Sequence, residues 1–410
     1  MSASPKTDSL TGPPLPFREF VSLLALLIAL TALSIDIMLP ALPEIGRSFS
    51  VDADNDRQMV VTGYLVGLAF GQLIWGHLSD LIGRRVPLLV GLGIYVVGSV
   101  MALSAPSFLA LIFARVCQGI GGSAGRTITT AIVRDTFSGR DMARTMSFVM
   151  MVFIIVPMLA PSAGQGLLHL GNWRWAFGAL LLVGVVASVW VAARLPETWK
   201  PALKGAPARL GIRASLHAVM SSPATRGYGL AAGLIFGCLV AYISSSQQIF
   251  VDVYGLGDLF PLAFGCIASS MAIAAFTNAM LVRRLGMRRL SHTAMMAFIA
   301  TSLVLTGLCL VGRPPLAVLM ALLALCFYLF SLMQSNFNTI AMQPVGHVAG
   351  MASSLLGAFV TGAGAVLGTI IGRCFDGTPL PLAAGFATLG ICAFLVVLSV
   401  EGPRGLFRGE

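Results

Sequence analysis

Twelve apolar stretches, each about as long as a helix that crosses a bilayer, dominate this sequence. A membrane-spanning helix needs about 20 predominantly apolar residues. The stretches are continuously apolar rather than alternating, which excludes transmembrane β-strands. We therefore predict twelve spans, at residues 20–40, 58–76, 86–104, 107–133, 145–168, 175–195, 227–250, 259–282, 291–311, 316–341, 351–373 and 380–400.

Charge is scarce in the chain and unevenly placed. Only 10% of the residues are charged, against about 25% in soluble domains. This excludes a soluble enzyme, and the net charge of +10 does not indicate a nucleic-acid partner because the basic residues lie in short segments between apolar runs. The first stretch contains Asp36 and ends at Pro40 without a small-residue cleavage site, so we expect a retained helix rather than a signal peptide.

The distribution of Lys and Arg predicts the orientation, because cytoplasmic loops are enriched in both. Segments on one side of the predicted membrane carry most of the 26 Lys and Arg residues, Arg84 and Arg85 among them. The loops on the opposite side hold Arg47, Arg57, Arg174, Arg313 and Arg373. We therefore expect both termini in the cytoplasm.

The longest polar break, residues 196–226, follows the sixth predicted span. We interpret it as a cytoplasmic linker between an N-terminal half, residues 1–195, and a C-terminal half, residues 227–410. The segment GHLSDLIGRRV at 76–86 is faintly repeated as AMLVRRLGMRRL at 279–290, about half a chain length later. Parallel six-span repeats are typical of secondary transporters, whose substrate site lies between the repeats near the membrane midplane.

Cofactor sites are not expected. The cysteines lie in or beside apolar runs without a CxxC spacing, so we interpret them as reduced packing residues. No GxxxxGK[ST] stretch occurs, so ATP is not expected to drive this protein. The five histidines lie in loops or at span ends, and we expect them at the surface.

Several motifs resemble those of a known family. GHLSDLIGRR (76–85) closely matches Gly-x-Leu-x-Asp-x-x-Gly-Arg-Arg/Lys, the motif between spans 2 and 3 of the major facilitator superfamily. RVCQGIGGSAG (115–125) resembles the span 4 motif Arg-x-x-Gln-Gly of its proton-coupled members. Three further stretches resemble the Bcr/CflA branch of twelve-span drug:proton antiporters: SIDIMLPALPEIG (34–46), AIVRDTFSGRDMAR (131–144) and QPVGHVAGMASSLLG (343–357).

The resemblance implies an all-α protein of the bacterial inner membrane, with twelve helices in two six-helix halves. It implies export of small amphipathic, drug-like compounds in exchange for protons, by a monomer in contact with lipid and without a cofactor. The antiporter motif of span 5 is incomplete in VPMLAPSAGQG (156–166). Pro161 and Gly164 are kept, Ala160 and Gln165 replace two glycines, and Pro157 offers another bend.

Asp36 is the one acidic residue that we place clearly inside a span, with Arg115 of span 4 at a comparable depth. Placing an ionisable group in hydrocarbon costs several kcal/mol unless the group is paired or hydrated. An ionisable residue inside a span therefore suggests a functional site. We expect Asp36 and Arg115 to couple transport to protons. The alternatives are an ion pair that locks spans 1 and 4 together, or an Asp36 that faces water.

Other polar residues inside the spans are candidates for a substrate cavity. Arg126 follows Arg115 by about three helical turns, so both arginines share a face and could flank the cavity. Alternatively, Arg126 snorkels along the span. The remaining candidates are each as consistent with an interhelical hydrogen bond, and they are Tyr64, Gln118, Tyr242, Gln247, Gln334 and Asn338.

The loop after span 2 is expected to act as a conformational latch. Asp80 can accept a bond from a loop arginine or cap a helix, while Gly76 and Gly83 allow close helix approach. Arg84 and Arg85 also suit a solvated, positively charged turn. The resemblance implies a drug:proton exporter, and the alternatives are a metabolite transporter and then a non-transporting receptor.

Overall fold

The computed structural model describes residues 15–51, 54–199 and 212–402, and within them the chain is helical without a β-strand. Twelve helices are long and apolar enough to cross a membrane, as predicted. The elements of the N-terminal half are α1 Phe17–Asp36, η1 Leu39–Ala41, α2 Leu42–Ser48, η2 Asp54–Gln58, α3 Met59–Ile82, α4 Arg85–Leu103, α5 Phe108–Thr136, α6 Gly139–Leu170 and α7 Arg174–Arg194. Those that follow are α8 Ile212–Ser221, α9 Pro223–Gln247, η3 Gln248–Val253, η4 Gly257–Leu259, α10 Phe260–Leu285, α11 Met287–Val311, α12 Leu316–Met342, η5 Gln343–Val348, α13 Ala349–Arg373 and α14 Leu380–Glu401.

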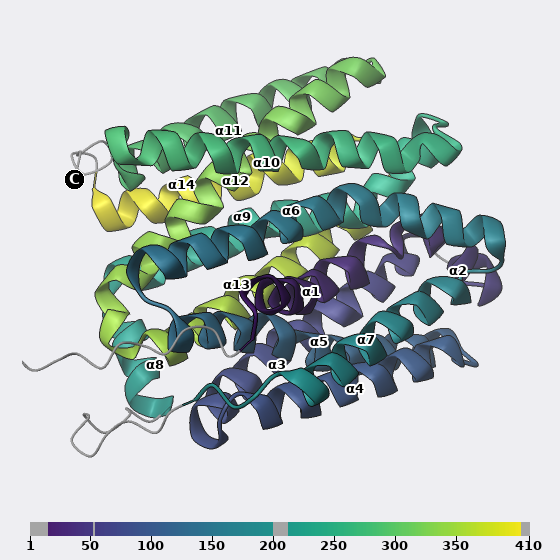
Figure 1. The fold of residues 1–410 in the computed structure, drawn as a ribbon. Helices are drawn as coiled ribbons and strands as arrows, with labels where there is room; N and C mark the ends of the chain where they lie inside the picture. Colours follow the sequence, from purple (N-terminus) through teal and green to yellow (C-terminus); the bar gives the residue numbers. More distant parts are fainter. Residues whose placement is uncertain (1–14, 52–53, 200–211, 403–410) are drawn as a thin grey trace, which may run out of the picture.

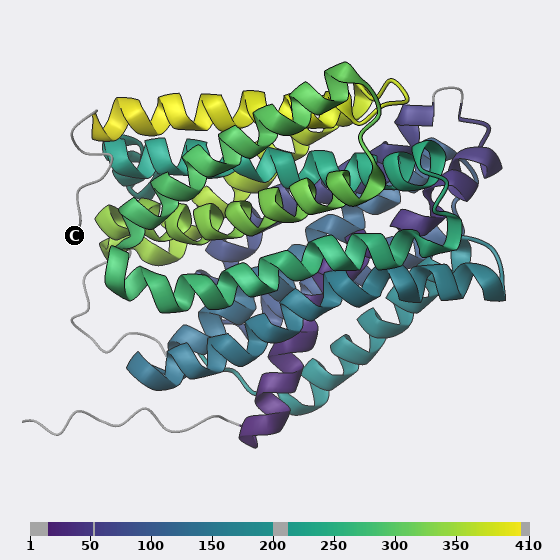
Figure 2. The ribbon, with the colours of Figure 1, turned by 90° about the horizontal axis from the view of Figure 1, so that it is seen from above.

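The long helices run roughly side by side along one axis, with α1–α7 and α9–α14 gathered in separate groups (Figures 1 and 2). We call the end of the bundle where α14 ends the proximal side, and the opposite end the distal side. The proximal side lies at the left of Figure 1, where α8 also lies, and α2 lies at the distal side.

Helix α9 begins inside the segment that we expected to be linker. Ser222 accepts a hydrogen bond from the backbone N–H of Thr225 at 3.2 Å, and Pro223 occupies the first helical position. A serine cap followed by proline is a strong helix start. The predicted start at residue 227 was therefore four residues late, because the polar residues before it belong to the first helical turn.

Glycines bring α3 and α5 into direct backbone contact. A Cβ atom on Gly67 would lie 2.1 Å from the carbonyl oxygen of Val116, and one on Gly119 would lie 2.1 Å from that of Tyr64. Any larger residue would force the two helices apart. The glycine-rich stretch of span 4 is thus a packing seam, as small residues are in many membrane helix pairs.

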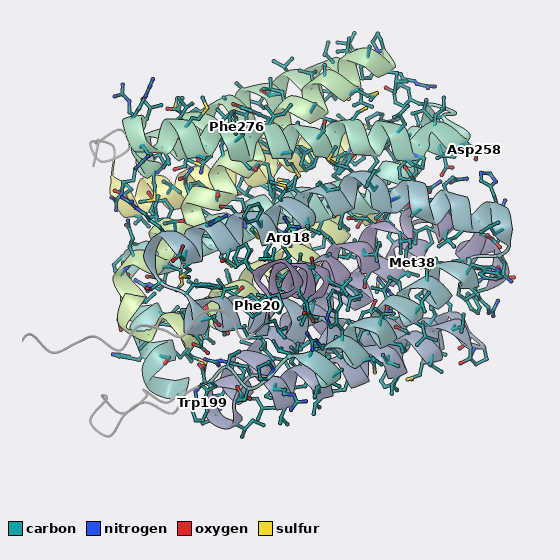
Figure 3. The ribbon with its side chains drawn as sticks, in the orientation of Figure 1. Arg18, Phe20, Met38, Trp199, Asp258 and Phe276 are labelled. Carbon is teal, nitrogen blue, oxygen red and sulfur yellow. The ribbon has the colours of Figure 1, made fainter. Side chains whose placement is uncertain are left out.

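Large apolar side chains cover the outside of the bundle. Phe276 on α10, labelled in Figure 3, is 69% exposed, and Leu109 on α5 is 78% exposed. Exposed apolar surface on this scale is rare in soluble monomers and marks an interaction site. In a chain with twelve candidate spans, the natural contact for this surface is the hydrocarbon of the bilayer.

The two groups of helices meet mainly where α3 packs on α13 and α6 packs on α10. The α3–α13 contact contains paired polar side chains: Thr62 and Thr369 have their hydroxyl oxygens 2.8 Å apart, and Gln72 donates to Thr361 at 3.1 Å. Gly265 of α10 lies against the backbone of α6 at Met158.

The expectation that all histidines lie at the surface was wrong for His292. Its side chain is buried in α11, and its Nε2 lies 2.9 Å from the hydroxyl of Tyr228. Tyr228 donates to Glu401, which also accepts a bond from Arg288. This cluster joins α9, α11 and α14 at the proximal side. The sequence placed His292 near a predicted span end, which gave no sign that three helices would bury it.

Candidate transport site

Asp36 is the last residue of α1 and is only 4% exposed. No ion pair or hydrogen bond involving its carboxyl group is found within the described residues. The short helix η1 that follows it touches α9 of the other half. Asp36 therefore lies where the two halves face each other, as an acidic group without a fixed partner.

The expected pairing of Asp36 with Arg115 is absent from this structure. Arg115 is fully buried and donates from Nε to the carbonyl oxygen of Val60 at 3.0 Å, and from Nη2 to that of Ser34 at 2.9 Å. Its Nη1 donates to Gln118. The backbones of α1 and α3 hold the guanidinium, and each of its three nitrogens already donates one hydrogen bond.

Two other predicted cavity residues, Gln118 and Tyr64, contact the Arg115 guanidinium. Gln118 is fully buried and donates to Ser99 at 2.8 Å. The ring of Tyr64 is also buried and lies 4.6 Å from the Arg115 guanidinium, within cation–π range. Both side chains lie in the interior of the N-terminal half, and the Tyr64 hydroxyl has no hydrogen-bond partner in the described part of the chain.

Arg126 has a different environment from Arg115, although it shares the same face of α5. Its side chain is exposed, as are those of Thr130 and Arg134, four and eight residues later. Thr130 and Arg134 line a pocket shared with α13 of the other half. Because residues four apart lie on one helix face, this face of α5 points at the space between the halves. Of the two arginines, only Arg126, the one nearer the proximal side, faces that space.

The C-terminal half contributes buried polar atoms that have no partner in the described part of the chain. They are the Tyr242 hydroxyl and both amide atoms of Gln247 on α9, together with the Gln334 amide oxygen on α12. Tyr242 packs between the rings of Phe264 and Phe327, with centroids 5.3 and 4.6 Å away. A buried polar atom without a partner costs about 1–3 kcal/mol, so these atoms are suited to bind a solute that can form hydrogen bonds.

Asn338, the last of the predicted cavity residues, is exposed on α12. It lies one turn beyond Gln334, which is only partly exposed. The residues named from the sequence as one cavity therefore fall into two groups. Tyr64 and Gln118 pack inside the N-terminal half, and the others lie on α5, α9 and α12.

The span 5 motif adjoins Asp36. Helix α6 continues through both Pro157 and Pro161. A Cβ atom on Gly164 would lie 2.2 Å from the carbonyl oxygen of Ile37. The glycine that this motif keeps thus lets α6 touch the backbone directly after Asp36.

The predicted latch residues come together at the proximal side. Arg84 is 3% exposed and forms two ion pairs of 2.6 Å, one with Asp80 and one with Asp135. Asp135 was not singled out from the sequence, because its place at the end of α5 gave no sign that it would meet Arg84. Gly83 ends α3 with φ +97°, and its counterpart Gly286 has φ +79° at the α10–α11 junction. Both glycines adopt a backbone conformation that favours glycine.

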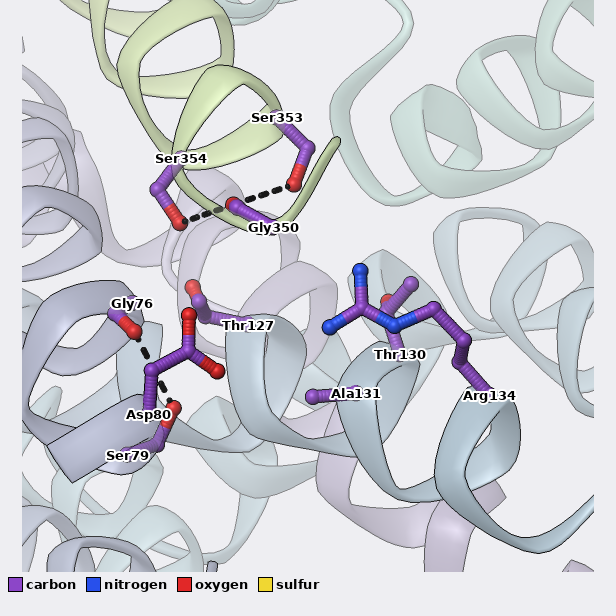
Figure 4. A pocket seen from close by; sticks show the side chains of 10 residues that line it. All are labelled: Gly76, Ser79, Asp80, Thr127, Thr130, Ala131, Arg134, Gly350, Ser353 and Ser354. Carbon is purple, nitrogen blue, oxygen red and sulfur yellow. Dashed lines mark hydrogen bonds between the residues drawn. The ribbon is translucent and has the colours of Figure 1, made fainter. Parts of the chain in front are cut away.

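Figure 4 shows how the latch meets α13. The carboxyl group of Asp80 points toward the first turn of α13, where a Cβ atom on Gly350 would lie 3.1 Å from Asp80 Oδ2. A Cβ atom on Gly76 would lie 1.9 Å from the Ser354 hydroxyl. The pocket between these groups has a volume of about 30 Å³, which is room for water rather than for a drug. The latch pocket is therefore too small in this structure to hold a drug-sized compound.

Glu197, which follows α7, holds the start of α4. Its carboxylate accepts bonds from the backbone N–H groups of Arg84 at 2.8 Å and Arg85 at 3.0 Å. Burial by itself would raise the pKa of the Glu197 carboxyl. The hydrogen bonds from these backbone N–H groups and from that of Trp199 outweigh burial, so the pKa lies below its usual value. Arg85 also donates to the carbonyl oxygen of Ala192 at 2.7 Å. Arg85 thus joins α4 to α7 and does not contact Asp80.

Replacing Arg84 with Ala is expected to lower the free energy of unfolding by about 2 kcal/mol, because two partly buried carboxylates each lose the ion pair with this residue. Thermal unfolding of the purified protein in detergent would measure the effect. Arg140→Ala is the matched control, since Arg140 is an exposed proximal arginine. Equal melting temperatures for Arg84→Ala and the wild type would contradict a structural role for the two ion pairs.

Comparison with known proteins decides the family. The model of the Major Facilitator Superfamily matches residues 24–369. The chain belongs to the Major Facilitator Superfamily. It is a transporter rather than an enzyme, and a multi-pass protein of the bacterial inner membrane.

Named relatives and solved structures of the Major Facilitator Superfamily agree with this assignment. An uncharacterized MFS-type transporter of Bacillus subtilis, YdgK, is 32% identical, covering 91% of this chain and 93% of its own. The bicyclomycin resistance protein homolog of Haemophilus influenzae is 30% identical, over 93% and 94% of the two chains. The human organic anion transporter MFSD10 has the same fold, with a TM-score of 0.70 at 18% identity, over 93% of this chain and 100% of its own.

Proposed function

We propose that this protein exports small amphipathic, drug-like compounds in exchange for protons, by alternating access of one site between its two halves. The observation that carries the proposal is Asp36: a buried carboxyl group at the meeting of the halves, without a partner in the described chain. Such a group can bind a proton in one access state and release it in the other, because its hydration differs between them.

The substrate class is inferred from buried aromatic and polar groups of the C-terminal half. Tyr242 with Phe264 and Phe327 offers aromatic surface, and Gln247 and Gln334 offer unpaired amide atoms. An apolar site with a few hydrogen-bonding groups suits amphipathic compounds. The names of relatives support this class: bicyclomycin resistance protein homolog, and chloramphenicol resistance protein of Pseudomonas aeruginosa, 37% identical over 41% of this chain and 40% of its own.

The proposal includes an orientation and a division of the chain. Both termini lie in the cytoplasm, so the proximal side is cytoplasmic and the distal side periplasmic. Residues 1–195 and 227–410 form the moving halves. They are joined by the linker 196–226, whose last residues, from Pro223 on, are the first turn of α9. The protein works as a monomer surrounded by lipid.

The test is drug susceptibility and accumulation in an efflux-deficient bacterial strain that expresses this protein. We expect resistance to at least one of an amphenicol, a bicyclomycin-type compound, a sulfonamide and a lipophilic cation. The corresponding compound should accumulate less than in cells with an empty vector. A protonophore should remove the difference, because export depends on the proton gradient.

A second candidate is a proton-coupled transporter of an endogenous metabolite. The span 5 motif favours it, since Ala160 and Gln165 stand where drug antiporters of this type have glycine. Susceptibility unchanged for every compound at verified membrane abundance would reject drug export in favour of this candidate.

A further inference from the structure

Arg126 of α5 is a charged residue inside a span that has no partner. Its side chain is exposed and forms no ion pair or side-chain hydrogen bond with any other residue that the structure describes. Thr130, one turn later on the same face, lines the pocket shared with α13 (Figure 4). An arginine inside a span is costly and marks a functional pathway. The guanidinium donors of Arg126 are therefore available to a ligand in the space between the halves.

One helical turn before Arg126, Gly122 leaves room for a hydroxyl group from α3. A Cβ atom on Gly122 would lie 2.6 Å from the hydroxyl oxygen of Tyr64. Because Cα–Cβ bonds in a helix tilt toward its N-terminus, that of Arg126 points toward the turn that contains Gly122. Tyr64 is fully buried, and its hydroxyl has no hydrogen-bond partner among the described residues. A phenol that can donate thus lies on the side toward which Arg126 is directed.

A second hydroxyl without a partner lies at a similar level on α1. The carbonyl oxygen of Leu27 would lie 2.6 Å from a Cβ atom on Gly125, and that of Ser34 accepts a bond from Arg115 at 2.9 Å. Helices α1 and α5 are therefore antiparallel here, and Thr31 falls between the two contacts, beside the glycine-rich turns of α5. Thr31 is 2% exposed, and its hydroxyl has no hydrogen-bond partner within the described chain.

These three groups together favour an anion. A guanidinium is always charged and has only donors, and a hydroxyl without a partner can donate as well. Arginine binds a carboxylate through two parallel N–H···O bonds, which a neutral group does not match in strength. A cation would meet the uncompensated charge of Arg126, since no described acidic side chain forms an ion pair with it.

We propose that Arg126, with the hydroxyls of Tyr64 and Thr31, binds the anionic group of the exported compound, so that this protein prefers amphipathic organic anions such as aryl carboxylates. The inference deepens the proposed function and rests on it, because it specifies the charge of the compound. Within the susceptibility panel, the sulfonamide can lose a proton and become an anion, whereas the lipophilic cation is the compound least suited to this site.

Binding of three fluorescent probes to the purified full chain in phosphatidylcholine nanodiscs tests the anion site. Dansylglycine carries a carboxylate, its primary amide is neutral and has nearly the same shape, and dansylcadaverine is a cation. Fluorescence titration, corrected with empty nanodiscs, gives the dissociation constant of each probe. We expect dansylglycine to bind about tenfold more tightly than its amide. Dansylcadaverine should bind more weakly than the amide, because Arg126 repels it.

Variants assign the binding to the named groups. Arg126→Gln should weaken dansylglycine binding about tenfold and leave the amide unchanged, because only the charge is lost. Arg126→Lys keeps the charge without the planar fork and should bind dansylglycine with intermediate affinity. Tyr64→Phe keeps the ring beside Arg115 and removes only the hydroxyl, so dansylglycine should bind about threefold more weakly. Arg140→Gln is the matched control, since Arg140 is an exposed arginine in the first turn of α6, and it should change no affinity.

The anion site is overturned if dansylglycine shows no saturable binding, if it binds Arg126→Gln as tightly as the wild type, or if the amide or the cation binds the wild type equally well. Displacement of dansylglycine by an equal concentration of acetate would also overturn it, by assigning these groups to small anions. The titration uses neither a proton gradient nor a resistant strain. Binding that depends on Arg126, without resistance to any panel compound, would reject drug export and keep the anion site. Resistance to neutral compounds, with equal binding to Arg126→Gln and the wild type, would do the reverse.

Discussion

Replacing Asp36 with Asn is expected to return drug susceptibility to that of cells with an empty vector, while the protein still folds and reaches the membrane. The amide has nearly the shape of the carboxylic acid but cannot release a proton, so the exchange cycle loses its coupling step. Susceptibility to whichever compound the wild type exports would be measured at equal membrane abundance. Proton release upon drug addition in everted vesicles would be lost in parallel.

Asp141→Asn is the matched control for this variant. Asp141 lies in the first turn of α6, exposed, and forms no ion pair with another described residue. It should leave resistance at the wild-type level. If resistance survives in Asp36→Asn, the protein still exports drugs, but the coupling role assigned to Asp36 is wrong.

Arg115→Met is expected to have the largest effect on stability. The change leaves the carbonyl oxygens of Ser34 and Val60 and the side chain of Gln118 without their charged donor. Each hydrogen bond to a charged group contributes about 1.5–3 kcal/mol, so the total loss should exceed about 3 kcal/mol. We expect little folded protein after detergent extraction, and a clearly lower melting temperature for whatever remains.

Two further variants separate the structural role of Arg115 from a role of its charge. Arg115→Lys keeps the charge, but a lysine ammonium does not reproduce the planar fork of donors, so this variant should also be destabilised. Arg126→Met removes the exposed arginine of the same helix and should melt near the wild type. A stable Arg115→Lys protein that has lost only proton coupling would restore the function that the sequence indicated for Arg115.

The span pattern and the loop motif could be predicted from the sequence because both are local. Each span is a run of apolar residues, and the family motif places Asp80 within one helical turn of Arg84. The ion pair between them follows from that spacing. Gly83 and Gly286 likewise occupy equivalent junctions, as the faint repeat indicated.

What the sequence could not predict depends on which helices become neighbours. Depth in the membrane placed Asp36 and Arg115 at a similar level, but the rotation of α5 directs the guanidinium to the backbones of α1 and α3. Gln58 donates to Gln248 of the other half, and no local pattern joins them. His292 was expected at the surface because it lies near a predicted span end, where three helices in fact enclose it.

The glycine seam between α3 and α5 has a consequence for how force travels through the protein. Helices in backbone contact cannot slide past each other without collision, so the N-terminal half behaves as a stiff lever. A stiff lever passes a displacement at one end to the other with little loss. A displacement near Asp36 would then reach the proximal latch without any chain of side-chain rearrangements between them.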